Sequence, residues 1–533
     1  MNETITGLAT GLATGLTTGL TTAARTGFPI LTLLTAVPVA GAIIAFFVGK
    51  HARGVALLTA LASLVLSLLV WMHLPADGSI GLVELHGWAP SIGVEYHLGV
   101  DGLGALMLVL SAIVTLMSVD AAHRVHHQPG LYYALVLLLE SGLIGSFTAL
   151  NFFHWFLFWE LSLIPAFFLI KLWGGPKRGP AATQFFVYTM AGSVALLLAF
   201  LAVFLSTGTM DFEQLAAMAA SGALSQMVTA HLGAVMPWLA IGVLAGFAVK
   251  VPLMPFHTWL PNAYAEAPSP VTMLLTGAMS KMGVYGLLRI ALPIFGPQIA
   301  AMRTPLLVLA VATVVMGAWA AAAQKDLKRV FAYSSVNHLG YCLLGIFALA
   351  IPGSGAAASI SVEASRAAAL NGVILQMFNH GITAAALFWF LAMIQMRSGG
   401  LRGMDDFGGL RKPAPIFAGL MGIALFSSLG LPGLNGFVGE FLIFRGVFPL
   451  SWISATASVL GLLVTAAVIL TVIQKVFTGP VPERWAAFPD LHASERLALA
   501  PVIGLMLLLG LVPQLIVDTL NPTVAYLLAH WRF

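Results

Sequence analysis

The sequence predicts an all-α polytopic membrane protein with about 14 transmembrane helices, two of them broken. Only 8% of its 533 residues are charged and 59% are hydrophobic, whereas a soluble domain carries about 25% charged residues. Apolar runs of about 20 residues, the length that crosses the hydrocarbon core of a bilayer, recur along the chain. Proline and glycine interrupt two of these runs, a pattern typical of transporter helices that unwind inside the membrane.

The apolar runs place the expected spans in order. We place them near residues 28–48, 54–74, 101–121, 131–150, 152–173, 183–206, 236–256, 266–291, 304–323, 328–351, 367–396, 414–446, 452–477 and 496–518. Residues 1–27 are rich in Gly, Thr and Leu and lack the basic start of a signal peptide, so we expect a flexible tail there.

Lysine and arginine are unevenly distributed between the loops of this arrangement. The loops after odd-numbered spans carry most of them, including Lys177, Arg178 and the KDLKR group at 325–329. The opposite loops carry acidic residues such as Asp211 and Glu213. Since positively charged loops stay in the cytoplasm, we expect a multi-pass protein of the inner (plasma) membrane with both termini on the outer, periplasmic side. We interpret the KDLKR group as a cytoplasmic anchor.

The composition argues against several kinds of chemistry. Cys342 is the single cysteine, so the sequence offers neither an internal disulfide nor a cysteine-ligated cluster. It contains no glycine-rich nucleotide-binding motif, and nothing in it points to nucleic acid as a partner. His123, His126 and His127 form a histidine-rich loop, which we interpret as solvated rather than metal-binding. We expect no metal or cofactor site in this chain.

Two expected spans contain a helix break beside a charged residue. In the seventh, Pro252 and Pro255 follow Lys250 and remove backbone donors. In the twelfth, the Gly- and Pro-rich segment LGLPGLNG (429–436) precedes Glu440. Unwound backbone at this depth is tolerated only where protein or a wet cavity surrounds it, so both breaks predict access for water.

The two breaks lie five spans apart, which divides the chain into units. Spans 4–8 and 9–13 form two five-helix repeats, and because five is odd the second repeat is inverted relative to the first. The expected organisation is a tail (1–27), a three-helix segment (28–130), a first repeat (131–291), a second repeat (304–477), and a C-terminal helix and tail (478–533).

Ionisable side chains lie inside these spans. A charge at bilayer depth costs at least about 2.5–3.5 kcal/mol, so such residues are usually functional. Glu160 lies within the fifth span and Lys250 just before the first break, and we expect these opposite charges to form a pair. A static ion pair that fixes helix packing is the alternative. Glu140 in the fourth span is a further buried carboxylate, with either a modulating or a packing role.

A second group of polar residues lies in later spans: Lys281, His338, His380 and Glu440. Lys281 has no acidic residue on its own helix, and burial that destabilises the charged form suits a proton carrier. Histidine changes charge near physiological pH and can relay protons. The histidines fall between Lys281 and Glu440 in the chain, so we expect a relay that ends at Glu440. The alternative for each histidine is a hydrogen-bonded packing residue.

Four long motifs now identify a family. They are WELSLIPAFFLI (159–170), KVPLMPFHTWLPNAYAEAPSPVTMLLTGAMSKMGVYGLLR (250–289), QKDLKRVFAYSSVNHLG (324–340) and LGLPGLNGFVGEF (429–441). Together they resemble the antiporter-like, proton-translocating membrane subunits of respiratory complex I, over nearly the whole chain from residue 85 onward. Glu440 stands where the related L, N and Mrp antiporter subunits typically have lysine. The chain also stops after the last span, so it most resembles the subunit M (chain 4) family.

The resemblance implies a membrane-arm subunit of an NADH:quinone oxidoreductase that moves protons while quinone is reduced elsewhere in the complex. It implies the following roles: a switch pair (Glu160 and Lys250), a central lysine (Lys281), a relay (His338 and His380) and an exit carboxylate (Glu440). The complex would use NADH or another donor, flavin, iron–sulfur clusters and quinone, none of them bound by this chain. The implied partners are L- and N-type membrane subunits and the lipid bilayer.

Two other functions stay open. The first is a subunit of a multi-subunit Na⁺/H⁺ antiporter, against which Glu440 argues. The second is a non-pumping scaffold of a hydrogenase-like complex, against which the intact Lys250 and Lys281 argue. The sequence also departs from the family pattern in its N-terminal extension, in Asn337 where serine is more typical, and in a long loop of small residues expected at 352–366.

Overall fold

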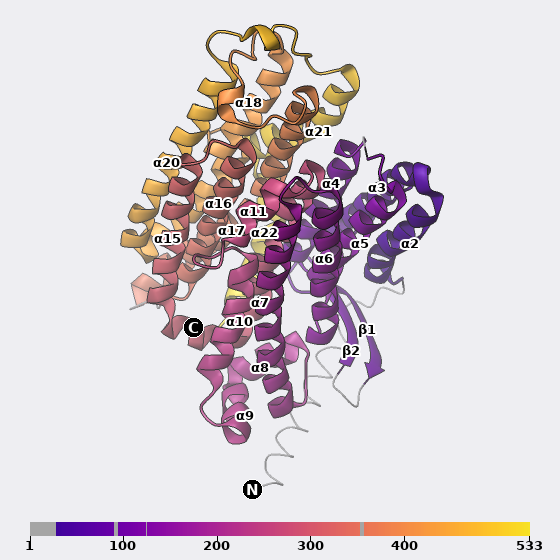
Figure 1. Cartoon of the computed structure of the whole chain (residues 1–533). Helices are drawn as coiled ribbons and strands as arrows, with labels where there is room; N and C mark the ends of the chain where they lie inside the picture. The colour runs from indigo at the N-terminus through magenta and orange to yellow at the C-terminus, as the bar shows by residue number, and fades with distance from the viewer. Residues whose placement is uncertain (1–27, 90–93, 124, 352–355) are drawn as a thin grey trace.

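The computed structural model describes residues 28–89, 94–123, 125–351 and 356–533, so the tail expected at 1–27 lies outside the described residues (Figure 1). The elements of the first half are α2 (Ile30–Val48), η1 (Gly49–His51), α3 (Ala52–Met72), β1 (Gly81–Ala89), β2 (Val94–Val100), α4 (Gly102–Ala121), α5 (Pro129–Thr148), α6 (Phe152–Trp173), α7 (Arg178–Thr207), α8 (Phe212–Ser221), α9 (Ala223–Leu232), α10 (Met236–Lys250), α11 (Trp259–Glu266), α12 (Ser269–Leu274), η3 (Leu275–Met279), α13 (Lys281–Gly286), η4 (Leu287–Ala291) and α14 (Leu292–Ala301).

The second half continues the helical pattern to the end of the chain. Its elements are α15 (Arg303–Ala322), α16 (Leu327–Leu349), α17 (Ala356–Arg397), η5 (Met404–Asp406), α18 (Pro415–Leu429), α19 (Asn435–Leu450), α20 (Trp452–Phe477), η6 (Glu483–Trp485), α21 (Ala493–Leu511) and α22 (Gln514–His530). Side chains cap several of these helices: Asp101 accepts from Gly104 N at the start of α4, and Asp326 accepts from Lys328 N at the start of α16.

The prediction of a membrane protein built almost entirely from helices is confirmed. Within the described residues, 11 helices are long and apolar enough to cross a membrane, or 12 if the bent pair α9–α10 counts as one span. The tally of 12 differs from the 14 expected spans for two reasons. The run Ile30–Met72 counts once although it contains both α2 and α3. In addition, α18 and α19 are each shorter than a full span because a break separates them.

Both predicted helix breaks are present. Helix α10 ends at Lys250, and α11 begins only at Trp259 beyond Pro252 and Pro255. Helix α18 ends at Leu429, and α19 begins at Asn435. A bend of 106° between α9 and α10 was not expected from the sequence.

The strictly all-α prediction is wrong at one place, residues 81–100. Strands β1 and β2 form an antiparallel hairpin in which Gly81 pairs with Val100 and Leu85 with His97. The hairpin packs beside α2 and α6. Glu84 on β1 accepts from Leu31 N at 2.7 Å and from Thr32 N at 3.1 Å. The hairpin thereby satisfies backbone donors at the start of α2 that have no partner inside the helix.

Three other segments also differ from expectation. The loop expected at 352–366 is helical from Ala356, where α17 begins, and residues 352–355 lie outside the described part. The expected loop after α7 contains the short helices α8 and α9, and the expected C-terminal tail contains α22, which packs against α4 and α17. Small residues favour helix as readily as loop when neighbouring helices cover them, because alanine is the best helix former.

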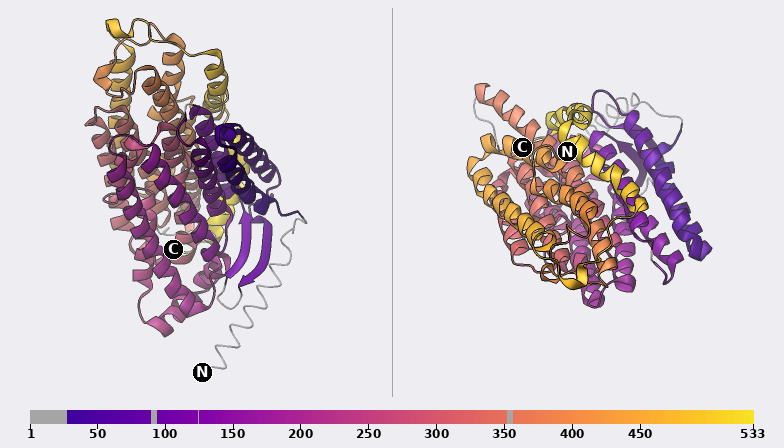
Figure 2. Two further views of the ribbon diagram at one scale, coloured as in Figure 1. Left: turned by 45° about the vertical axis from the view of Figure 1, so that its right-hand side comes forward. Right: turned by 90° about the horizontal axis from the view of Figure 1, so that it is seen from above.

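Burial divides the helices into a central and a peripheral group. In the most apolar 18-residue stretch of each helix, 94% of the residues are buried in α16 and in α17 and 89% in α4. In α21 only 28% are buried. Figure 2 shows the N-terminal helices and α20 on opposite flanks of the bundle. The peripheral helices expose large apolar side chains such as Leu58 and Leu463, as a lipid-facing surface does. Polar residues of the central helices are therefore enclosed by protein.

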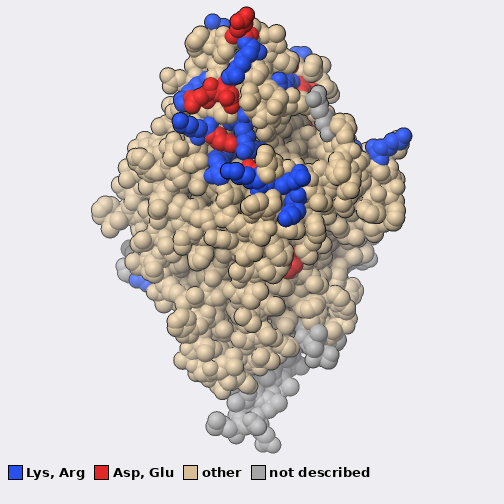
Figure 3. All heavy atoms as spheres, viewed as in Figure 1, with Lys and Arg blue, Asp and Glu red and all other residues tan. Residues whose placement is uncertain are grey.

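Lysine and arginine gather at one end of the molecule, around α18 and the adjoining loops (Figure 3). Arg411 and Lys412 are exposed there. Within the KDLKR group, which we interpret as a cytoplasmic anchor, Lys328 does not reach the surface, since it is only 2% exposed. Its Nζ donates to the carbonyl of Ala267 at 2.5 Å, and thus satisfies backbone acceptors past the end of α11.

Candidate functional site

Four ionisable side chains from four helices meet where the Lys281 segment of the first half packs against the second half. Lys281 on α13 is fully buried, and its Nζ lies 2.7 Å from Nδ1 of His380 on α17. The ring of His380 lies 5.2 Å from that of His338 on α16, centroid to centroid. His338 Nδ1 in turn lies 3.0 Å from Oε1 of Glu440 on α19. The four form a row of buried side chains, in which the two histidine rings are neighbours without a direct hydrogen bond.

The structure gives the order of the two histidines, which the sequence left open. His380 makes the contact with Lys281, and His338 makes the contact with Glu440. The reason is the packing of the long helix α17 against the Lys281 segment, which brings His380 closest to it.

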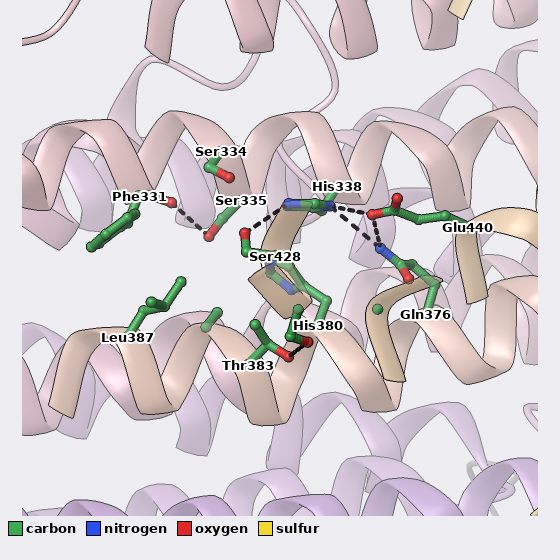
Figure 4. Close-up of a pocket in the computed structure, with 13 residues that line it drawn as sticks. Phe331, Ser334, Ser335, His338, Gln376, His380, Thr383, Leu387, Ser428 and Glu440 are labelled. Carbon is green, nitrogen blue, oxygen red and sulfur yellow. Dashed lines mark hydrogen bonds and ion pairs between the residues drawn. The ribbon is translucent and has the colours of Figure 1, made fainter. Parts of the chain in front are cut away.

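Glu440 and His338 share further polar partners (Figure 4). Gln376 Nε2 lies 3.4 Å from both Glu440 Oε1 and His338 Nδ1, and Ser428 Oγ lies 3.3 Å from His338 Nε2. A carboxylate oxygen accepts hydrogen bonds, so a proton on Nδ1 of His338 is the one that this ring can donate to Glu440. Nε2 then accepts from the Ser428 hydroxyl.

The sequence analysis missed Gln376 and Ser428. Gln376 precedes His380 by four residues, and residues at that spacing share one face of a helix, so a polar stripe on the expected eleventh span was the available signal. Ser428 is the second-last residue of α18. Its role depends on where the break directs the chain, which no local pattern reveals.

Glycine makes room for the carboxylate at the second break. Gly430 has φ +81°, and a Cβ added there would lie 2.6 Å from Glu440 Oε2. Any other residue would be both strained in this backbone conformation and too close to Glu440. The break predicted from glycine and proline therefore serves to admit Glu440.

Lys281 is positioned by an irregular helix. The π-helical segment η3 (Leu275–Met279) precedes it and η4 (Leu287–Ala291) follows it. Wider turns of this kind leave carbonyls free for other donors and often mark functional sites. Lys281 Nζ donates to the Thr276 carbonyl at 2.5 Å.

A small polar cavity of about 20 Å³ lies along the row. It is lined by both histidines and Glu440 together with the hydroxyls of Ser334 and Ser335 and other residues. A site needs roughly 10–15 Å³ and two to four polar partners to hold a water molecule, and this cavity meets both conditions. Water there would span the distance between the two histidine rings.

The first half holds Lys250, which is 2% exposed at the end of α10. Its Nζ lies 4.5 Å from the centre of the Trp159 ring and 3.4 Å from Ser162 Oγ. Glu160 acts on it electrostatically, without forming an ion pair at contact distance. The expected partners are thus neighbours on α6 and α10, and Trp159 and Ser162 take the places closest to the lysine.

Glu140 on α5 is fully buried, and neither carboxylate oxygen has a hydrogen-bond partner within the described residues. Ser63 on α3 is the polar side chain that faces it. Glu140 is therefore separate from the row that ends at Glu440. No hydrogen bond in the described part of the chain joins Lys250 to Lys281 either.

Among the residues that the structure describes, no three His, Cys, Asp or Glu side chains lie close enough together to hold a metal ion. The lysine, histidine and carboxylate groups that do come together are instead groups that take up and release protons. The arrangement is suited chemically to hand a proton from one side chain to the next.

Comparison with known proteins shows which family shares this architecture. The family model described as "NADH:quinone oxidoreductase/Mrp antiporter, TM" matches residues 149–469. NADH-quinone oxidoreductase subunit M of Rhodobacter capsulatus is 34% identical, and the alignment covers 94% of this chain and 97% of that protein. Subunit M of Mycobacterium tuberculosis is 32% identical, with 93% of each chain covered.

Solved structures of related proteins have the same fold. A chain of respiratory complex I from Thermus thermophilus with bound NADH superposes with a TM-score of 0.81 at 28% identity, covering 94% of this chain and 100% of that one. A chain of the Mrp complex from Dietzia sp. shares the fold, with a TM-score of 0.77 at 24% identity over 93% of this chain and 97% of that chain. The chain described here belongs to the subunit M (chain 4) family of antiporter-like membrane subunits of complex I-type NADH:quinone oxidoreductases.

Proposed function

We propose that this subunit translocates protons through the row Lys281–His380–His338–Glu440. The observation that carries the proposal is the row of four buried proton-exchanging groups, with contacts of 2.7 Å at its start and 3.0 Å at its end. Groups buried at this depth are costly to retain, and four of them aligned by four helices are not needed to pack a bundle. Glu440 is the terminal group that releases the proton towards the outer side.

Lys250 and Glu160 supply the control step in this proposal. Lys250 rests on the Trp159 ring and Ser162 rather than on the carboxylate, so the pair has a second arrangement available in which the two side chains touch. Closing the pair stabilises the charge on Lys250, and opening it promotes release of the proton. Quinone reduction elsewhere in the complex biases the two arrangements, as any coupled equilibrium requires. Glu140 modulates the charge balance of the first half.

The proposed topology keeps the two inverted repeats and fourteen crossings. Helices α2 and α3 cross separately, and the pairs α10–α11 and α18–α19 each make one broken crossing. The two repeats then comprise residues 131–291 and 304–477, with the Lys- and Arg-rich end in the cytoplasm (Figure 3). Both termini lie on the outer side, in the inner (plasma) membrane.

The assembly is proposed on the same basis. The similar chain from Thermus thermophilus is part of respiratory complex I, so we place this subunit in a membrane arm beside L- and N-type antiporter-like subunits. NADH or another donor, flavin, iron–sulfur clusters and quinone act in other subunits. A relative in Methanosarcina mazei is named F(420)H(2) dehydrogenase subunit M, at 33% identity, so the choice of electron donor is independent of this subunit.

The family model covers antiporter subunits as well, and transport of Na⁺ is the competing function. Hard cations such as Na⁺ prefer shells of oxygen ligands. Lys281 and the two histidines instead present nitrogen atoms that bind and release protons. The chemistry of the row therefore favours H⁺ as the coupling ion.

The test is proton pumping by the intact complex in sealed vesicles, with Lys281→Gln beside Lys412→Gln as the matched control. Lys412 is exposed at the surface, so its replacement removes the same charge outside the row. We expect Lys281→Gln to reduce pumping and coupled quinone reduction together by more than tenfold, with donor oxidation by an artificial acceptor retained. Unchanged pumping in an assembled Lys281→Gln complex overturns the proposal and favours a scaffold.

A further inference from the structure

Two adjacent residues of α6, Trp159 and Glu160, lie beside the ammonium group of Lys250. The ammonium lies over the Trp159 ring, 4.5 Å from its centre, and acts on Glu160 without an ion pair at contact distance. The Oε1 oxygen of Glu160 is buried and has no hydrogen-bond partner within the described residues. Glu160 can therefore still receive the ammonium that Trp159 now holds.

The Trp159 ring is fixed by its neighbours on three helices. Its Nε1 donates to Ser193 Oγ on α7 at 2.9 Å. Its ring centroid lies 4.8 Å from that of Trp155 on α6 and 5.8 Å from that of Phe247 on α10. Phe247 precedes Lys250 on the same helix. The indole thus presents a fixed face, and the flexible side chain of the contact is the lysine.

Ser162 completes the place where the ammonium rests, and we call Trp159 and Ser162 together the indole site. Ser162 Oγ donates to the carbonyl of Trp159 at 2.7 Å, which leaves a lone pair to accept from Lys250 Nζ at 3.4 Å. A cation over the face of an indole is stabilised electrostatically, most strongly where water is excluded. Lys250 and Trp159 are each only 2% exposed, so the indole site holds a charged lysine without a carboxylate.

We propose that the indole site competes with Glu160 for the protonated Lys250, and that the balance between the two sets the control step of proton translocation. This inference rests on the proposed function, in which the Lys250–Glu160 pair opens and closes. Consecutive residues lie about 100° apart around a helix axis. The lysine therefore changes partner by rotating its own four-carbon side chain, and the switch needs no movement of α10 or of the break after it.

Trp159 is a positioning residue in this scheme. The indole face carries only partial negative charge, so it stabilises the ammonium less than a full carboxylate does and leaves the proton easier to release. Contact with Glu160 removes water from a half-buried carboxylate, and this desolvation cost offsets part of the stronger attraction. A weaker indole site would shift Lys250 towards Glu160, hold the pair closed and slow release of the proton.

The test replaces Trp159 by a series from monofluoro- to tetrafluorotryptophan, incorporated at this one position in the intact complex. Fluorine withdraws negative charge from the ring face and barely changes the shape of the ring, so it weakens the contact with the cation while the packing stays. We expect proton pumping in sealed vesicles to fall with each added fluorine, by about threefold or more for tetrafluorotryptophan.

Trp155 provides the matched control for this series. It is fully buried on the same helix, and no Lys or Arg lies over its ring in the part of the chain that the structure describes. The same substitutions at Trp155 should leave pumping unchanged. A loss that recurs at Trp155, or that is as large for one fluorine as for four, reflects packing and overturns the proposal.

A Lys250→Gln complex separates the fate of the indole site from that of the proposed function. Impaired pumping by Lys250→Gln together with no effect of fluorine at Trp159 overturns the indole site and leaves the control step at Lys250 in place. Normal pumping by Lys250→Gln overturns both. Impaired pumping by Lys250→Gln together with a graded loss at Trp159 alone supports both.

Discussion

Glu440 is held by donors from two helices, His338 on α16 and Gln376 on α17. A carboxylate that releases protons must exchange them with a neighbouring group without being held in one strong hydrogen bond. The hydrogen bond from Gln376 to Glu440 is long, at 3.4 Å, and therefore weak. It orients the carboxylate without holding it strongly. Gln376 is thus a positioning residue for the last step of the row.

Replacing Gln376 with leucine tests this role at the level of one side chain. The Gln376→Leu substitution removes a neutral donor, typically a net loss of about 0.5–1.5 kcal/mol, so we expect proton pumping to fall two- to tenfold with assembly unchanged. The measurement is the initial rate of pumping in sealed vesicles. Gln474→Leu is the control, because Gln474 is exposed on α20. Equal rates in the two variants would show that Gln376 only fills space.

At the scale of elements, the break between α18 and α19 fixes where Glu440 lies. Gly430→Ala places a residue with φ +81° in a conformation that costs roughly 1–2 kcal/mol and adds a Cβ 2.6 Å from Glu440 Oε2. We expect a lower thermal inactivation temperature for the complex and weaker pumping. The control is Gly422→Ala, within α18, where an added Cβ meets nothing within 4 Å. Matching behaviour of both variants would contradict the steric argument.

The β1–β2 hairpin is the second element whose attachment is testable, through pH. His97 on β2 lies 2.5 Å from Asp211 and 3.7 Å from Glu213 at the start of α8. Burial lowers the pKa of His97, but the hydrogen bond and charge of Asp211, helped by Glu213 and Glu95, raise it above its ordinary value. Burial also raises the pKa of Glu95 and of Glu213.

A group whose pKa is raised by folding stabilises the folded form below its ordinary pKa, and that contribution is lost as the pH rises through the folded value. All three shifts have this sign, so we expect the hairpin to be held more tightly at pH 6 than at pH 8. His97→Gln should remove about 1–2 kcal/mol of the pH 6 contribution. Hydrogen exchange of residues 94–100 in the intact complex, corrected for intrinsic rates, measures it. His86→Gln, at an exposed position of β1, should change nothing.

For the whole molecule, the sequence predicted the parts that depend on local physics. Charges in apolar runs identified Lys281 and Glu440, and proline or glycine beside a charge identified both breaks, because each signal is contained in a few neighbouring residues. The hairpin at 81–100 was not predicted, because hydropathy averaged over the length of a membrane span does not detect short strands. Helices α8 and α9 were not predicted for the same reason, because each has only 10 residues.

The order in space of the buried polar residues could not be predicted from any local sequence pattern. His380 contacts Lys281 although His338 comes first in the chain, because the contact depends on which face of α17 packs on the Lys281 segment. The same limit applies to Lys328, whose burial depends on the end of α11. Hydropathy and charge identify candidate residues, and helix packing decides which of them are neighbours.

Two glycines let the two halves of the molecule approach each other closely. A Cβ on Gly381 would lie 2.6 Å from the Gly277 carbonyl, and one on Gly277 would lie 3.3 Å from the Gly381 carbonyl. Gly277 belongs to η3 in the first proposed repeat and Gly381 to α17 in the second. Gly381 adjoins His380, so this close crossing sets the 2.7 Å contact between His380 and Lys281.

Gly381→Ala should therefore uncouple the two halves. The backbone carbonyl of Gly277 cannot rotate away as a side chain would, so α17 must shift, and interiors packed this closely transmit such a shift. We expect pumping to fall more than tenfold while the complex assembles and still oxidises its donor with an artificial acceptor. Gly504→Ala on α21, where an added Cβ meets nothing within 4 Å, should pump normally. Normal pumping by Gly381→Ala would mean that protons do not pass from Lys281 to His380, and that each half works through a separate path.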